Sequence, residues 1–224
     1  MKPFRIIIIA LLVSAVAATA QHSPPPQQKA GSSMAGMHHH DESSAAAIVS
    51  YSELKRTLDT LERTRKATDK YHDIHRAQAD GYRQIGPDLP GMGIHYLLNA
   101  SPEKFEPEKP PILLYESNQS VAGGYSLVGV AYLLNAAEGP EGQPQNPPFP
   151  KSLALWHRHA NICMMKDGTH TMGATEEKCR QKGGNFTLQS QWMIHAWIWK
   201  DSPLGLFSPT NPLVSTQTKG ASAK

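Results

Sequence analysis

Three short segments of this 224-residue chain place histidine among bulky apolar or aromatic residues, and they carry four of its 11 histidines. The segments read Ile94-His95-Tyr96, Trp156-His157-Arg158-His159 and Ile194-His195-Ala196-Trp197. Each has the composition of a β-strand, in which successive side chains point to opposite faces. His157 and His159 should therefore project from the same side. A matching register of the other two strands would bring three or four imidazoles to one place.

Imidazole nitrogen is a ligand for zinc, copper, nickel and non-haem iron. We therefore predict a transition-metal site, with zinc or copper as the metal and His157, His159, His195 and then His95 as the ligands. Glu116 ends an apolar run and is the predicted carboxylate, either as a ligand or as the hydrogen-bond partner of one. The bulky neighbours would limit the access of solvent to a bound cation.

Three classes of function remain open at this stage. A closed shell of protein ligands predicts an exported metal-binding protein without turnover. Three ligands and an open position beside a cavity predict a metal-dependent enzyme. If the histidines only form hydrogen bonds within the sheet, the chain is an envelope or interaction protein without a metal. The sequence has no G-x-S-x-G, H-E-x-x-H or phosphate-binding loop that would indicate another catalytic class.

The first 20 residues have the pattern of a secretory signal peptide. A basic start with Lys2 and Arg5 precedes an apolar run over 6–16 and the small residues Ala18-Thr19-Ala20. The run is shorter than the roughly 20 residues that a membrane span needs. We predict that residues 1–20 are removed on export, which leaves a protein without a stable membrane anchor in the periplasm or outside the cell.

The charge balance argues against nucleic acid as a partner. The chain has 22 basic and 19 acidic residues, and loss of Lys2 and Arg5 leaves 20 against 19, a net charge of +1. A nucleic-acid binder usually carries a large basic surplus. The expected partner is therefore a metal ion, and the sequence identifies no protein partner.

The two cysteines, Cys163 and Cys179, are predicted to form a disulfide. In an oxidising compartment, two cysteines this far apart form a disulfide more often than a metal pair or a reactive thiol. The bridge would close the polar loop between them.

Residues 21–47 are rich in proline, glutamine and small side chains, and contain too few large apolar residues to offset the entropy of ordering. We predict a disordered tail. His38, His39 and His40 follow Met34 and Met37 in this tail, and imidazole and thioether are both copper ligands. These histidines are a candidate auxiliary metal-binding tail, with a chance feature of linker composition as the alternative.

A long amphipathic helix is predicted over 51–79. Ser50 and Glu53 have the spacing of a capping box, and apolar residues recur at helical intervals after them. His72 and His75 lie near its end at a spacing that could bind a metal, but we interpret them as solvated or capping residues.

The periodicity changes after residue 86, and short β-rich runs follow between turn-forming clusters. The predicted strands are Ile94–Leu98, Ile112–Glu116, Tyr125–Leu134, Leu153–Cys163 and Trp192–Trp199. The expected fold is α+β, with a long N-terminal helix packed on a mostly antiparallel β-sheet or small β-barrel. It would form a single domain over 48–215, followed by a disordered C-terminal tail over 216–224.

Three groups of segments also resemble an uncharacterised family of secreted bacterial proteins. They are Gly91-Met92-Gly93-Ile94-His95-Tyr96, the runs 111–116 and 127–130, and His195-Ala196-Trp197-Ile198-Trp199 with 203–207 and Asn211-Pro212. The similarity extends over about 71–212. It implies export and a single domain, and no activity can be transferred from it.

Overall fold

The computed structural model describes residues 49–139, 141–166 and 169–216. The predicted signal peptide over 1–20 and the His38–His40 tail over 21–47 lie outside the described residues, as do positions 217–224 of the predicted C-terminal tail.

The largest element is an antiparallel five-stranded sheet with the order β1-β2-β3-β4-β8. Its strands are β1 (Arg83–Leu89), β2 (Gly93–Leu97), β3 (Ile112–Ser117), β4 (Tyr125–Leu134) and β8 (Trp192–Ala196). A short 3₁₀ turn, η2 (Ala122–Gly124), precedes β4. Because β8 pairs with β4, the last described strand extends a sheet of four consecutive strands, β1 to β4.

The two faces of this sheet have different surroundings. One face contributes side chains such as Tyr96, Tyr115 and Tyr132 to the main apolar core, together with Leu61 and Ile74 from the helices. The opposite face carries a smaller apolar cluster. Its residues on neighbouring strands, Ile112, Leu114, Ala131 and Leu133, alternate with those of the first face, as the two-residue period of a strand requires.

The prediction of one long N-terminal helix packed on a sheet or barrel is wrong, because the helical region is divided into three elements. Helix α1 (Tyr51–Thr68) is followed by the 3₁₀ helix η1 (Asp69–His72) and the short helix α2 (Ile74–Ala79). The break occurs at Asp73, which has extended backbone angles and accepts a hydrogen bond from His75 N. An Asp side chain that caps a new helix start in this way competes with continuation of the old helix. No helix in the described part of the chain has the length and apolarity to cross a membrane.

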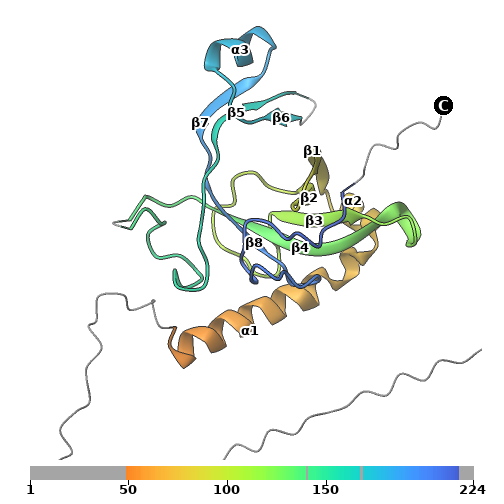
Figure 1. Ribbon diagram of the computed structural model, residues 1–224, viewed down its shortest axis with the longest axis vertical. Helices are drawn as coiled ribbons and strands as arrows, with labels where there is room; N and C mark the ends of the chain where they lie inside the picture. The colour runs from red at the N-terminus through yellow and green to blue at the C-terminus, as the bar shows by residue number, and fades with distance from the viewer. Residues whose placement is uncertain (1–48, 140, 167–168, 217–224) are drawn as a thin grey trace, which may run out of the picture. The chain divides into compact units, whose positions relative to one another are not determined.

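A second sheet of three antiparallel strands projects from the main sheet (Figure 1). It consists of β5 (Ala160–Met164), β6 (His170–Thr171) and β7 (Asn185–Gln189), with the order β6-β5-β7 and the short helix α3 (Glu176–Gln181) at its end. We call this unit the arm. The predicted strand over 153–163 therefore begins later than expected and belongs mostly to the arm.

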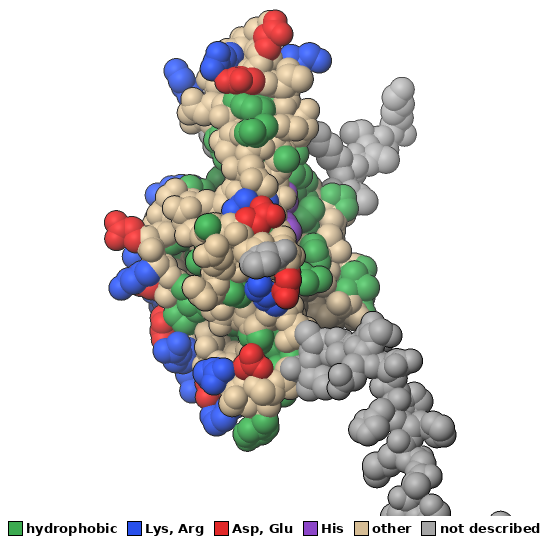
Figure 2. Space-filling view, turned by 90° about the vertical axis from the view of Figure 1, so that its left-hand side faces the viewer, with side chains coloured by type: hydrophobic (Ala, Val, Ile, Leu, Met, Phe, Trp, Pro, Cys, Tyr) green, Lys and Arg blue, Asp and Glu red, His purple; other side chains and the backbone are tan. Residues whose placement is uncertain are grey.

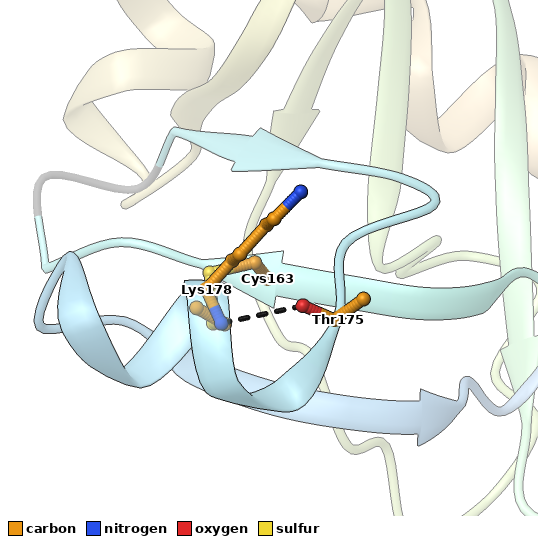
Figure 3. Close-up of a disulfide and its surroundings, with 4 residues drawn as sticks. Cys163, Thr175 and Lys178 are labelled. Atoms are coloured by element: carbon orange, nitrogen blue, oxygen red, sulfur yellow. Dashed lines mark hydrogen bonds between the residues drawn. A yellow bond between two sulfur atoms is a disulfide. The ribbon is translucent and has the colours of Figure 1, made fainter.

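The predicted disulfide is confirmed: Cys163 of β5 is bonded to Cys179 of α3, and both residues are buried. Figure 3 shows the bond beside the start of α3, where Thr175 caps the helix by accepting a hydrogen bond from Lys178 N. In Figure 2, charged side chains gather at the far end of the arm. The disulfide thus ties α3 to β5 in a small unit that has little apolar core of its own.

Replacing Cys163 and Cys179 with alanine should lower the free energy of unfolding by about 3 kcal/mol, the entropic value of closing a loop of this length. Urea denaturation of the double variant and the parent protein measures the difference. Substitution of exposed Ser152 by alanine is the control, and it should change stability by less than about 0.5 kcal/mol. Equal stability of the double variant and the parent would contradict a structural role for the bond.

Candidate metal centre

Two antiparallel chain segments connect the arm to the main sheet. Residues 157–164 run beside 185–193: His157 and Met193 exchange two backbone hydrogen bonds of 3.0 and 2.7 Å, and Ala160 pairs with Gln189 in the arm. Between them, Ser190 N donates to the His159 carbonyl, and His159 N donates to Ser190 Oγ. This ladder places His157 beside β8 and His159 at the base of the arm.

His95 and His195 reach toward each other across the second face of the main sheet. His95 of β2 pairs with Leu114, which pairs with Gly129 of β4, while His195 of β8 pairs with Ala131. Four strands in a flat sheet would separate the two backbones by about 14 Å. The imidazole rings nevertheless approach to 5.5 Å between centroids.

The facing atoms of the two rings are both Nε2, and they lie 3.4 Å apart. His195 Nδ1 is 2.7 Å from the Pro209 carbonyl, which can only accept, so Nδ1 carries the proton. In the neutral ring, the lone pair of His195 Nε2 therefore points to His95. Either His95 donates a hydrogen bond to it, or a cation accepts both lone pairs. Two nitrogen ligands of a tetrahedral zinc ion lie about 3.3 Å apart, which is close to the observed separation.

His157 and His159 extend this pair into a cluster. The ring centroids of His157 and His195 are 5.6 Å apart, and those of His157 and His159 are 5.1 Å apart. His157 Nδ1 is buried and forms no hydrogen bond within the described part of the protein. The structure thus brings together the four histidines that the sequence singled out.

A fifth histidine, His170, was missed by the sequence analysis. It comes from the two-residue strand β6, inside a polar loop that has too little strand character to be recognised. His170 faces β1 closely: a Cβ at Gly86 would lie 2.5 Å from His170 Cε1. Only glycine fits at position 86, where φ is also +67°.

All five histidines are held neutral by their surroundings. Burial lowers the pKa of His95 and of His157 to about 4, and it lowers the pKa of His159, His170 and His195 as well. Repulsion between neighbouring rings adds to this effect in all of them except His170. A neutral imidazole has a free lone pair, so none of these rings must lose a proton before it binds a metal at pH 7.

Glu116, the predicted carboxylate, forms an ion pair with Lys200. Its carboxylate accepts hydrogen bonds from Lys200 Nζ at 2.6 and 2.8 Å and from Ser215 N at 2.8 Å. The carboxylate is therefore neutralised by lysine and fixes the C-terminal segment against β3. His72, the other candidate from the sequence, packs its ring on Trp199 with the centroids 4.4 Å apart.

A cavity of about 360 Å³ opens beside the cluster, between the second face of the main sheet and the arm. His95, His159 and His170 contribute to its wall, which is otherwise mainly apolar. Figure 2 shows a small area of histidine at the surface below the arm, next to hydrophobic side chains. The cluster therefore lies at the edge of a cavity instead of in a sealed core.

The cluster consists of neighbouring pairs of rings and is not a closed coordination shell. Within residues 49–139, 141–166 and 169–216, no three or more His, Cys, Asp or Glu side chains are grouped so that they could hold one metal ion. Binding by a third histidine therefore requires rotation of a side chain.

Comparison with known protein families, characterised proteins and solved structures finds no match, so the functional argument rests on the site.

The buried neutral histidines predict a pH-dependent stability of the metal-free protein. In the unfolded chain a histidine binds a proton below about pH 6.5, whereas His95 and His157 resist protonation down to about pH 4. The stability that depends on these two neutral rings is therefore fully present above pH 6.5, and it is lost as the pH falls toward 4. Within that range, each of the two residues should lower the free energy of unfolding by about 1.4 kcal/mol for each unit by which the pH falls.

Denaturation with urea at several pH values, in the presence of a chelator, measures this slope. The double variant His95→Gln/His157→Gln should show a slope smaller by about 3 kcal/mol per pH unit, because glutamine does not titrate. An unchanged slope in this variant would show that the two rings are protonated in the folded protein.

Proposed function

We propose that this protein is exported and binds a transition metal ion through the histidine cluster, with His95 and His195 as the first two ligands. The observation that carries the proposal is the 3.4 Å separation of their Nε2 atoms. Two buried nitrogens at that distance can share one cation at ordinary metal–nitrogen bond lengths of about 2.0–2.1 Å.

The hydrogen bond from His195 Nδ1 to the Pro209 carbonyl supports this assignment. Histidines that ligate metals commonly donate their other ring N–H to a carbonyl or carboxylate, which fixes the tautomer and the direction of the lone pair. His195 is 1% exposed, so its ring has little freedom to turn away.

The third ligand would come from His157 or His159. The His157 ring already contacts that of His195, and its Nδ1 has no hydrogen bond to lose among the described residues. A different staggered rotamer of either ring could turn a nitrogen toward the His95 and His195 pair. This arrangement fits a site that closes around the metal when the metal arrives.

Two observations support an exported location. The first 20 residues have the signal-peptide pattern, and the cysteines form a disulfide that oxidising compartments favour. Zinc or copper capture outside the cytoplasm is the function most consistent with both the site and the disulfide.

The proposal predicts that His95→Gln/His195→Gln weakens zinc binding by at least 100-fold, because two of the first ligands are lost. Competition with a fluorescent zinc chelator measures the affinity, and circular dichroism checks the fold. His38, His39 and His40 are replaced by alanine in every variant so that the tail does not contribute. His72→Gln/His75→Gln is the matched control and should bind zinc as the parent does. Equal affinity of the two double variants would refute the proposal.

The cavity favours a second candidate, a metal-dependent enzyme with the same ligands. An ion held by two or three histidines at the cavity edge would keep a position for water or a small molecule. Azide added to the cobalt-loaded protein tests for that position. A shift in the visible absorption spectrum would favour the enzyme, whereas an unchanged spectrum would indicate a closed shell and a binding protein.

A further inference from the structure

Methionines are concentrated on the wall of the cavity. Five methionines lie in the described part of the chain, and four of them line this one cavity: Met92, Met164, Met172 and Met193. The fifth, Met165, lies outside it, with its sulfur near Gly184 and the disulfide.

Two of the four methionines are cross-strand partners of a histidine of the cluster. Met164 pairs directly with His170 across β5 and β6, and Met193 pairs with His157 at the bridge between β8 and the ladder. Cross-strand partners lie on the same face with Cβ atoms about 5 Å apart.

The other two methionines are near in sequence to a histidine. Met172 follows His170 by two residues, and Met92 precedes His95 by three, in the turn that leads into β2. Met172 is 48% exposed and Met92 is partly exposed, so these thioethers can reach a cation that enters the cavity. The wall of the cavity therefore carries both thioether sulfur and imidazole nitrogen donors.

We propose that Met92, Met164, Met172 and Met193 make this cavity a binding site for monovalent copper, and thereby identify the metal of the proposed function, on which this inference rests. Thioether sulfur is a soft ligand that selects Cu(I), while zinc sites use imidazole, thiolate and carboxylate. Methionine side chains are unbranched and adaptable, so four of them around a cavity can adjust to one ion.

The inference is tested with the purified protein in which His38, His39 and His40 are replaced by alanine and Met34 and Met37 by leucine. Into this background we place Met92→Leu/Met164→Leu/Met172→Leu/Met193→Leu, which conserves side-chain volume closely and removes the sulfur. Anaerobic competition with bicinchoninate measures Cu(I) affinity, and chelator competition measures zinc affinity. The quadruple variant should lose at least tenfold in Cu(I) affinity and stay within twofold for zinc. Met165→Leu is the matched control and should change neither.

The outcomes separate this inference from the proposed function. Cu(I) binding by the quadruple variant as tight as that of Met165→Leu overturns the copper assignment, while zinc loss in His95→Gln/His195→Gln would still support the histidine site. If the histidine variant keeps both metals, the proposed function itself fails. If the quadruple variant does not fold, the single variants Met92→Leu and Met172→Leu decide the question, because both positions lie outside the strands. Each variant should weaken the binding of Cu(I), and of its redox-inert analogue Ag(I), about threefold. Unchanged affinity in both variants overturns the copper assignment.

Discussion

The arrangement of this protein depends on the burial of uncharged imidazole rings on the second face of the main sheet. A polar ring that leaves water loses its hydrogen bonds to solvent. It must then form hydrogen bonds within the protein or remain neutral with unsatisfied nitrogen atoms. His195 has the Pro209 carbonyl on one nitrogen and His95 on the other. His157 has a buried nitrogen with no such partner among the described residues. A metal ion would supply the missing interaction to several rings at once, which is the physical reason to interpret the cluster as a binding site.

The fold holds these rings in place through connections between distant parts of the chain. β8 joins β4 on one side and His157 on the other, so this strand positions His157 relative to His195. The ladder continues into the arm, where the Cys163–Cys179 bond stabilises the strand that pairs with His170. Gly86 then allows His170 to lie against β1. The disulfide and Gly86 thus help to position the histidine cluster.

Sequence patterns located the four histidines and the disulfide because strand alternation and cysteine spacing are local signals. The start of α1 was equally local, and the capping box of Ser50 and Glu53 is present. The break at Asp73 was missed because the apolar stripe continues across it. The ion pair of Glu116 was not predicted because its partner, Lys200, lies 84 residues away and no local sequence pattern indicates such a pair. His170 was missed because its strand is only two residues long and forms by pairing with β5.

The central claim is that one cation shares the lone pairs of His95 and His195 Nε2. Anomalous diffraction from crystals of the protein grown with copper or zinc tests it most directly, because the peak locates the metal independently of any assay. We expect a peak about 2.0–2.1 Å from both Nε2 atoms, with a further nitrogen or sulfur ligand from the cavity wall. A peak at His72 and His75 or elsewhere on the surface, with the two Nε2 atoms still 3.4 Å apart and joined by a hydrogen bond, would contradict it.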